Sequence, residues 1–123
     1  MNVKENLTVK EIFVLAVQNQ QTNNFKIAEK LYKKILKINP NHATAHNNLG
    51  LIFHAFREFQ KAISCYEKAI EIQPNYAHAY NNLGVVFQKL KEFQKAKNYY
   101  EKAIEINPNY ADVHFNLGLV YKE

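Results

Sequence analysis

The chain has 123 residues, of which 47% are hydrophobic and 22% charged, a composition typical of one folded domain. A single cysteine, Cys65, excludes an internal disulfide framework, and three glycines and three prolines are too few for a loop-rich fold. The net charge of +5 favours acidic partners only weakly. Because the apolar run 12–17 is too short for a membrane span or a signal-peptide core, we expect a cytoplasmic protein.

The first predicted element is a helix that begins near Val9. Thr8 and Glu11 have the spacing of a capping box, in which the threonine side chain accepts from a free backbone amide and the glutamate side chain reaches back to the cap. We expect residues 1–8 to form an N-terminal tail, of which the part from Met1 to Leu7 is loose.

The next predicted helix is crowded with lysines, and only Glu29 opposes them: Lys26, Lys30, Lys33, Lys34 and Lys37. A cationic helix of this kind could contact nucleic acid or an acidic membrane. Such lysines are, however, ordinary solvated positions in most helices. We therefore do not expect a nucleic-acid or membrane partner.

An internal repeat of 34 residues organises the rest of the chain. Three sets of residues follow this step: Tyr32, Tyr66 and Tyr100; Pro40, Pro74 and Pro108; Gly50, Gly84 and Gly118. Within one unit, Ala45, Leu49 and Phe53 lie at helical spacing, a second apolar stripe covers residues 59–72, and a proline then ends the second helix. The sequence thus predicts one domain over 9–123, with helix pairs at 9–42, 43–76 and 77–110 and a half unit at 111–123.

The pattern of each unit resembles the tetratricopeptide repeat, from about Val9 to the end of the chain. In the second unit this resemblance rests on His46, Leu49, Gly50, Phe53, Ala62, Tyr66 and Pro74. It implies an all-α fold, a right-handed superhelix (α-solenoid) of antiparallel helix pairs, with three repeats plus one extra C-terminal helix. It also implies a scaffold or adaptor for protein–protein interaction and not an enzyme.

One departure from the family lies in the inner turns, which usually contain glycine. This chain has Asn23, Arg57 and Lys91 there. If these residues need positive φ, each strains its turn by on the order of 1 kcal/mol.

Polar amides recur in apolar surroundings at the same point of each unit, in NNLGLIF at 47–53, NNLGVVF at 81–87 and FNLGLVY at 115–121. Steps of three and four residues place side chains on one helix face. In tetratricopeptide stacks the first helices line a concave groove, so the resemblance implies a row of amides along it, with Asn47 and Asn81 at its flank. The residues expected in this groove are Asn47, Asn48, Leu51, His78, Asn81, Asn82, Val85, Asn116 and Leu119.

A primary amide can donate and accept hydrogen bonds at once, so the row could pair with the backbone of an extended peptide. The row is similar to the asparagine ladder of the repeats in O-linked N-acetylglucosamine transferase, which implies an extended polypeptide ligand without the transferase chemistry. The alternative is an ordinary solvated helix face, because asparagine is frequent throughout this chain. Against that alternative, each asparagine costs about 0.5–0.7 kcal/mol relative to alanine inside a helix.

A carboxylate clamp, as in chaperone-binding tetratricopeptide domains, does not fit this groove. Such a clamp needs lysine and arginine to bind a C-terminal carboxylate. The matching positions are Phe13, Val17, Asn48, His78 and Asn82, and only Asn48 fits.

No residue pattern indicates catalysis, a metal site or a cofactor. His42 and His46 have a spacing that can hold a metal, but His46 occupies a packing position of the repeat. Cys65 is expected to act as a small hydrophobe within a helix. The three glycines are isolated and do not form a phosphate-binding loop.

The last segment, 111–123, supplies the first helix of a fourth unit without its partner helix. Leu117, Leu119, Val120 and Tyr121 spread apolar groups over more than one side of it, so we expect something to cover them. A longer repeat protein, a homo-oligomer formed through this edge and a simple capping role all remain open. So does a regulatory arm of a larger enzyme.

Overall fold

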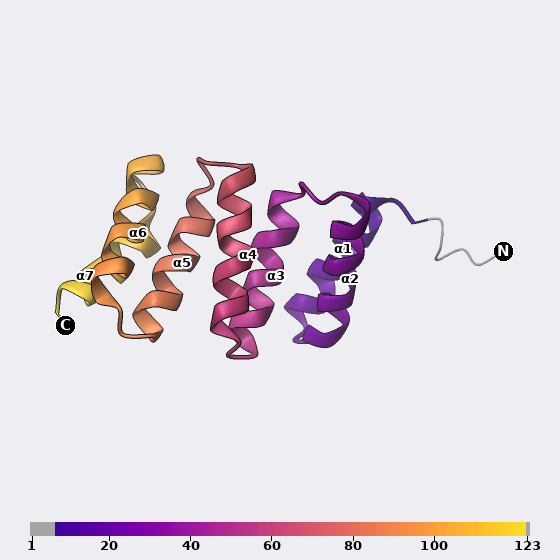
Figure 1. Ribbon diagram of the computed structural model, residues 1–123, viewed down its shortest axis with the longest axis horizontal. Helices are drawn as coiled ribbons and strands as arrows, with labels where there is room; N and C mark the ends of the chain where they lie inside the picture. The colour runs from indigo at the N-terminus through magenta and orange to yellow at the C-terminus, as the bar shows by residue number, and fades with distance from the viewer. Residues whose placement is uncertain (1–6, 123) are drawn as a thin grey trace.

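The computed structural model describes residues 7–122, and these residues form an elongated stack of helices that runs from one terminus to the other (Figure 1). The helices are α1 (Val9–Gln21), α2 (Phe25–Ile38), α3 (Ala43–Ala55), α4 (Phe59–Ile72), α5 (Ala77–Lys89), α6 (Phe93–Ile106) and α7 (Ala111–Tyr121). Consecutive helices pack together along the stack, most extensively within α1–α2, α3–α4 and α5–α6. The predicted all-α solenoid of helix pairs is confirmed. None of the described helices is long and apolar enough to cross a membrane.

The chain enters the stack through the predicted capping box. Glu11 N donates to Thr8 Oγ1 over 3.1 Å, and Thr8 N donates to Glu11 Oε1 over 3.1 Å. Leu7, expected to be part of a loose tail, is half-buried and packs against the core. Residues 1–6 of the expected tail lie outside the described residues, as does Glu123.

Each inner turn has its positive-φ residue at the position where the family usually has glycine. The φ angles are 64° at Asn23, 62° at Arg57 and 62° at Lys91. The next residue then closes the end of the preceding helix: Glu58 N donates to Phe53 O over 2.8 Å, and Glu92 N to Phe87 O over 2.9 Å. The turn therefore keeps its conformation although Arg57 and Lys91 strain the backbone there.

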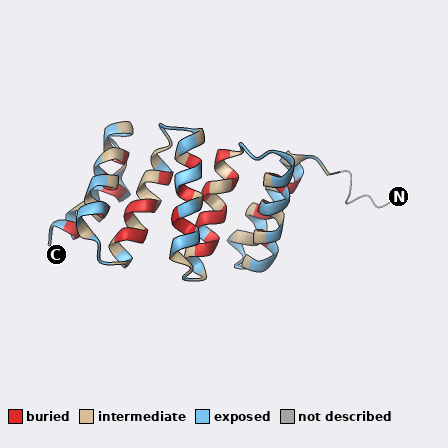
Figure 2. Ribbon diagram, in the orientation of Figure 1, coloured by how far each residue is buried: buried red, intermediate tan, exposed pale blue. Residues whose placement is uncertain are grey.

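The two helices of a unit meet where a tyrosine ring lies on a glycine. A Cβ placed on Gly50 would lie 2.5 Å from Cε1 of Tyr66, and one on Gly84 would lie 2.4 Å from Cε1 of Tyr100. Both tyrosines are fully buried, and buried residues concentrate where helices face one another (Figure 2). Gly118 differs, since no atom lies within 4 Å of a Cβ placed there.

The last helix, α7, is covered on one side only. Val113 and Val120 are buried, so the expectation that Val120 belongs to the uncovered surface was wrong: it faces the preceding unit. Phe115 is 67% exposed, Leu119 36% and Tyr121 61%. An open apolar surface on α7 is thus present, made by these three side chains.

Replacing Gly84 with alanine should destabilise the protein, whereas the same change at Gly118 should stabilise it. At Gly84 the added methyl group collides with the Tyr100 ring, and overpacking of this kind costs about 1–3 kcal/mol. At Gly118 the methyl group meets no neighbour, so the helix preference for alanine adds about 0.5–1 kcal/mol. Urea unfolding of both variants measures the difference, and equal effects would contradict this account of the tyrosine–glycine contact.

Candidate functional site

The first helices of successive units, α3, α5 and α7, carry a row of partly exposed side chains at equivalent positions of the repeat. We call it the amide face, and it consists of Asn48, Leu51, Asn82, Val85, Asn116 and Leu119. The three amides and Val85 are half-buried, while Leu51 is 37% and Leu119 36% exposed. The amides are therefore neither sealed in the core nor fully surrounded by solvent.

Hydrogen bonds between neighbouring units connect the asparagines of the first helices. Asn82 Nδ2 donates to Asn47 Oδ1 over 2.9 Å, and Asn116 Nδ2 donates to Asn81 Oδ1 over 3.3 Å. Sequence reasoning missed these bonds, although the repeat of adjacent asparagines contained the signal: the second amide of one pair lies beside the first amide of the preceding pair. These hydrogen bonds between units therefore offset part of the free energy that asparagine costs inside a helix.

Asn47 does not lie at an open flank, where it was expected. It is only 4% exposed, and its Nδ2 donates to Oδ1 of Asn48 over 3.4 Å while its oxygen accepts from Asn82. Asn81 remains half-buried and lies beside Tyr110. Asn47 thus supports the face from beneath and does not form its surface.

Two amides keep most of their hydrogen-bonding capacity. Asn82 and Asn116 each use one N–H, and within residues 7–122 nothing donates to their side-chain oxygens. Asn48 is more fully used, because it also donates to the hydroxyl of Tyr32 over 3.2 Å. An asparagine offers two donors and two acceptor sites, so Asn82 and Asn116 each retain one donor and both acceptor sites.

The buried tyrosines end in hydroxyl groups beneath this face, and the central one differs from the others. Tyr32 donates to Gln20 Oε1 over 2.6 Å and Tyr100 to Gln88 Oε1 over 2.7 Å. The corresponding residue of the middle unit is His54, and the buried Tyr66 hydroxyl has no partner among the described residues. Burial raises the pKa of Tyr100 to about 12.

His54 itself is held in its neutral form. Burial lowers its pKa, and the positive charges of Lys89 and Arg57 lower it further. Its ring lies edge-on against Phe59, with 5.3 Å between the ring centroids.

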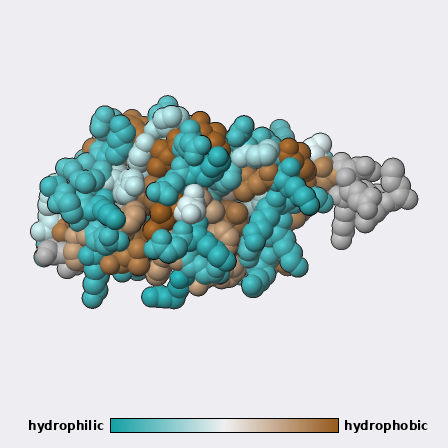
Figure 3. Space-filling model, viewed as in Figure 1, coloured by the Kyte–Doolittle hydropathy of each residue, from teal (hydrophilic) through white to brown (hydrophobic). Residues whose placement is uncertain are grey.

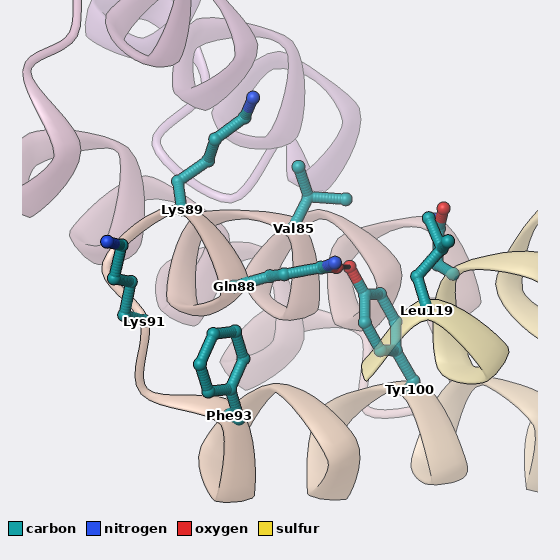
Figure 4. A pocket seen from close by; sticks show the side chains of 8 residues that line it. Val85, Gln88, Lys89, Lys91, Phe93, Tyr100 and Leu119 are labelled. Carbon is teal, nitrogen blue, oxygen red and sulfur yellow. Dashed lines mark hydrogen bonds between the residues drawn. The ribbon is translucent and has the colours of Figure 1, made fainter. Parts of the chain in front are cut away.

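A hollow of about 670 Å³ opens beside the amide face between α5, α6 and α7. Its lining consists of Val85, Gln88, Lys89, Lys91, Phe93, Tyr100, Asn116 and Leu119. Figure 4 shows Lys89 and Lys91 on one side and Leu119 on the other, with the Gln88–Tyr100 hydrogen bond between them. None of the lining residues is acidic, so the hollow offers apolar, amide and cationic groups together.

Aromatic residues lie at the opposite end of the first helices, where these helices begin. Nδ1 of His78 lies 2.6 Å from the hydroxyl of Tyr110, and their ring centroids are 5.2 Å apart. The ring of Tyr76 also contacts His78, with 6.4 Å between the ring centroids. In the first unit, Phe13 stacks on His42 at 5.4 Å.

The candidate metal-ligand histidines and the cysteine have structural roles. His42 caps α3 by accepting from Ala45 N over 3.1 Å, and His46 Nε2 lies 2.8 Å from Pro40 O. Burial raises the pKa of Cys65 to about 11, which keeps the thiol protonated and unreactive at neutral pH.

The lysines of α2 are partly engaged with the next unit. Nζ of Lys26 lies 5.2 Å from the ring centroid of Phe56, and Nζ of Lys33 lies 5.7 Å from that of Phe53. Lys33 also pairs with Glu29 at 2.7 Å. Long hydrophilic side chains cover much of the molecular face seen in Figure 3, with hydrophobic residues visible between them.

Replacing His54 with glutamine should stabilise the protein and flatten its response to acid. Glutamine would supply the acceptor that Tyr66 lacks, as Gln20 and Gln88 do for their tyrosines, and one hydrogen bond contributes about 1 kcal/mol. Because the pKa of His54 is lower in the folded state, the unfolded chain binds its proton first. The contribution of neutral His54 to the free energy of unfolding is therefore fully present above about pH 6.5, and it is lost as the pH falls through the folded-state pKa.

The matched control is His54→Ala, which also removes the titrating group but adds no acceptor. Urea unfolding between pH 5 and pH 8 should show the same pH response for both variants and higher stability for glutamine alone. Equal stability of the two variants would mean that Tyr66 gains nothing from an acceptor.

Comparisons with known proteins agree with this architecture. Models of the tetratricopeptide repeat (TPR) family match residues 14–42, 31–64, 58–91, 77–110 and 99–123. The structure of MamA is similar with a TM-score of 0.87 and 30% identity, over 94% of this chain and 67% of MamA. The comparison with curated proteins gave no match.

Two further solved structures share the fold at lower identity. The Sgt2 TPR domain from Aspergillus fumigatus has a TM-score of 0.87 and 22% identity, over 93% of this chain and 77% of that one. The first TPR of Spaghetti (RPAP3), bound to the HSP90 peptide SRMEEVD, has a TM-score of 0.88 and 19% identity, over 93% and 90%. With the predicted repeat spacing, the helix-pair stack and these matches in agreement, the chain belongs to the tetratricopeptide repeat family.

Proposed function

We propose that the protein is a non-catalytic interaction module that binds an extended segment of another protein along the amide face. The observation that carries this proposal is the spare hydrogen-bonding capacity of Asn82 and Asn116. Each side chain is held in place by one hydrogen bond while its oxygen and second N–H remain available. The same face would serve in a scaffold protein or in a regulatory arm joined to an enzyme domain.

The dimensions of the stack suit an extended ligand. Packed helices lie about 8–10 Å apart, which corresponds to about three residues of extended chain at about 3.3 Å each. Successive amides along a concave groove would therefore meet successive backbone groups of the ligand. Leu51, Val85 and Leu119 stand beside the amides and would contact the aliphatic parts of the ligand's side chains.

The peptide held by the Spaghetti domain supports a peptide ligand here in general terms only. A carboxylate clamp needs cationic side chains, and the first clamp position of this chain is Phe13, whose ring stacks on His42. We therefore propose a ligand that is recognised through its backbone and not through a free C-terminus.

Replacing Asn82 and Asn116 with alanine should weaken peptide binding about tenfold or more, because each change removes the hydrogen bonds of one amide to the ligand, worth about 1 kcal/mol or more. The measurement is retention of a degenerate nonapeptide library, acetylated and amidated at its ends, on the immobilised protein. Circular dichroism should show unchanged helix content.

Asn47→Ala is the matched control. This buried residue shares the hydrogen bond with Asn82 but does not form the surface, so its loss should reduce stability by about 1–2 kcal/mol. Because Asn82 then loses the bond that restricts its rotation but keeps its amide, peptide retention should fall by much less than in the double variant. If Asn47→Ala weakens retention as much as the double variant does, the amides act through stability alone and the proposal fails.

A second candidate function is self-association through α7. It is favoured by the exposure of Phe115 and Tyr121, at 67% and 61%, together with the unfilled space at Gly118, whose counterparts Gly50 and Gly84 are covered by tyrosine rings. Light scattering over a concentration series should then show a dimer that Tyr121→Glu dissociates. A monodisperse monomer at all concentrations would exclude this candidate.

A further inference from the structure

Acidic residues are segregated away from the amide face. Helices α3 and α5 contain no aspartate or glutamate. The ion pairs among the described residues all lie on the second helices α2, α4 and α6 or join them to the residue just before their start. The acidic residues of the other two first helices lie in their first turns: Glu11 in α1, and Asp112 in α7, where it is close to Tyr110. The amide face itself, and the ends of α3 and α5 beside it, carry no negative charge.

Cationic groups gather at the end of the face where the first helices terminate. Lys89 and Lys91 line the hollow next to Val85 and Leu119 (Figure 4), and neither has a carboxylate within ion-pair distance among residues 7–122. Arg57 occupies the equivalent turn of the preceding unit.

The acids nearest to these cations in sequence are already paired. Glu58 lies 2.8 Å from Lys61, and Glu92 lies 3.2 Å from Lys95. We call Arg57, Lys89 and Lys91 the cationic rim. Its charge is not neutralised from within the described part of the chain.

An aromatic rim runs along the opposite end of the same face. It consists of Tyr76 and Tyr110, which precede α5 and α7, and of His78, whose ring contacts both tyrosine rings. Because α3, α5 and α7 run in the same direction, all their starts lie on one rim and all their ends on the other. The amides lie between the two rims.

We propose that the extended ligand is an acidic peptide in which acidic and apolar residues alternate. Successive side chains of an extended chain point to opposite sides, so one set meets the cationic rim while the other meets the aromatic rim. Carboxylates would pair with Lys89 and Lys91 through charge-assisted hydrogen bonds, and apolar side chains would pack on Tyr76 and Tyr110. This inference rests on the proposed function and adds the chemical class of its ligand.

Two heptapeptides of equal composition test the pattern, ELELELE and EEEELLL, both acetylated, amidated and labelled with a fluorophore. Fluorescence anisotropy at low ionic strength should show about tenfold tighter binding of the alternating peptide, with affinity falling as salt is added. The peptide KLKLKLK should bind at least tenfold more weakly than ELELELE.

The variant Lys89→Gln/Lys91→Gln should lose about tenfold in affinity for ELELELE. Lys34→Gln/Lys37→Gln, on the exposed side of α2, changes the net charge equally and should change the affinity less than twofold. An equal loss in both double variants would show diffuse electrostatic attraction and overturn the assignment to this rim.

The remaining outcomes separate this inference from the proposed function. Equal binding of KLKLKLK and ELELELE, or no binding of either, would overturn the acidic ligand, whereas the proposed function stands or falls on library retention and its dependence on Asn82 and Asn116. If single-stranded oligouridylate displaces ELELELE and binds more tightly through Lys89 and Lys91, the cationic rim is a nucleic-acid surface and the peptide assignment is wrong.

Discussion

The contact of a tyrosine ring with a glycine backbone sets the distance between the two helices of a unit, and the rest of the structure depends on it. A ring that lies about where a Cβ would be leaves no space for any side chain at Gly50 or Gly84. The helices can approach closely only because the glycine has none, and Tyr66 and Tyr100 are then fully buried. The contact recurs after 34 residues in the second and third units, which therefore have the same shape and stack. In the first unit the buried Ala16 stands at the glycine position, and no atom of the described residues covers Gly118.

Stacking of equal units makes the first helices parallel neighbours, and this places Asn82 beside Asn47 and Asn116 beside Asn81. The second helices take nearly all the paired lysines and glutamates. The first helices are consequently free of the charge pairs of an ordinary solvated surface. A face that is half-buried, rich in amides and free of acids follows from the order of residues within one unit and is repeated by the stack.

Most of the fold could be predicted because its signals are local. Thr8 and Glu11 specify the start of α1, each proline follows the end of a second helix, and the 34-residue step specifies how the units recur. The position of the turn raised positive φ at Arg57 and Lys91 only as a condition, and the structure meets that condition. Helical periodicity identified the face that carries Asn48 and Asn82, but it could not decide which of two adjacent asparagines is buried.

The details that were missed depend on separations between units. Differences of about 1 Å in helix packing decide whether Asn47 reaches Asn82 and whether Tyr66 has an acceptor. A periodic sequence pattern contains no information about such differences. The side of α7 on which Val120 lies is decided by the preceding unit and not by its own helix. The cationic rim could not be predicted from the sequence, because Arg57, Lys89 and Lys91 belong to turns and helix ends that come together only in the stack.

The structural role of the amides and their proposed role in recognition are compatible, since an asparagine has more hydrogen-bonding groups than one contact can use. The bond from Asn82 to Asn47 consumes one donor and restricts the rotation of the side chain. A side chain already fixed in this way loses less conformational entropy when a ligand binds, and such preorganisation raises affinity without adding a contact. Aspartate would accept but could not donate to Asn47, and serine could not reach both a neighbouring helix and a ligand. A carboxamide is the side chain that can meet both the structural demand and the proposed one.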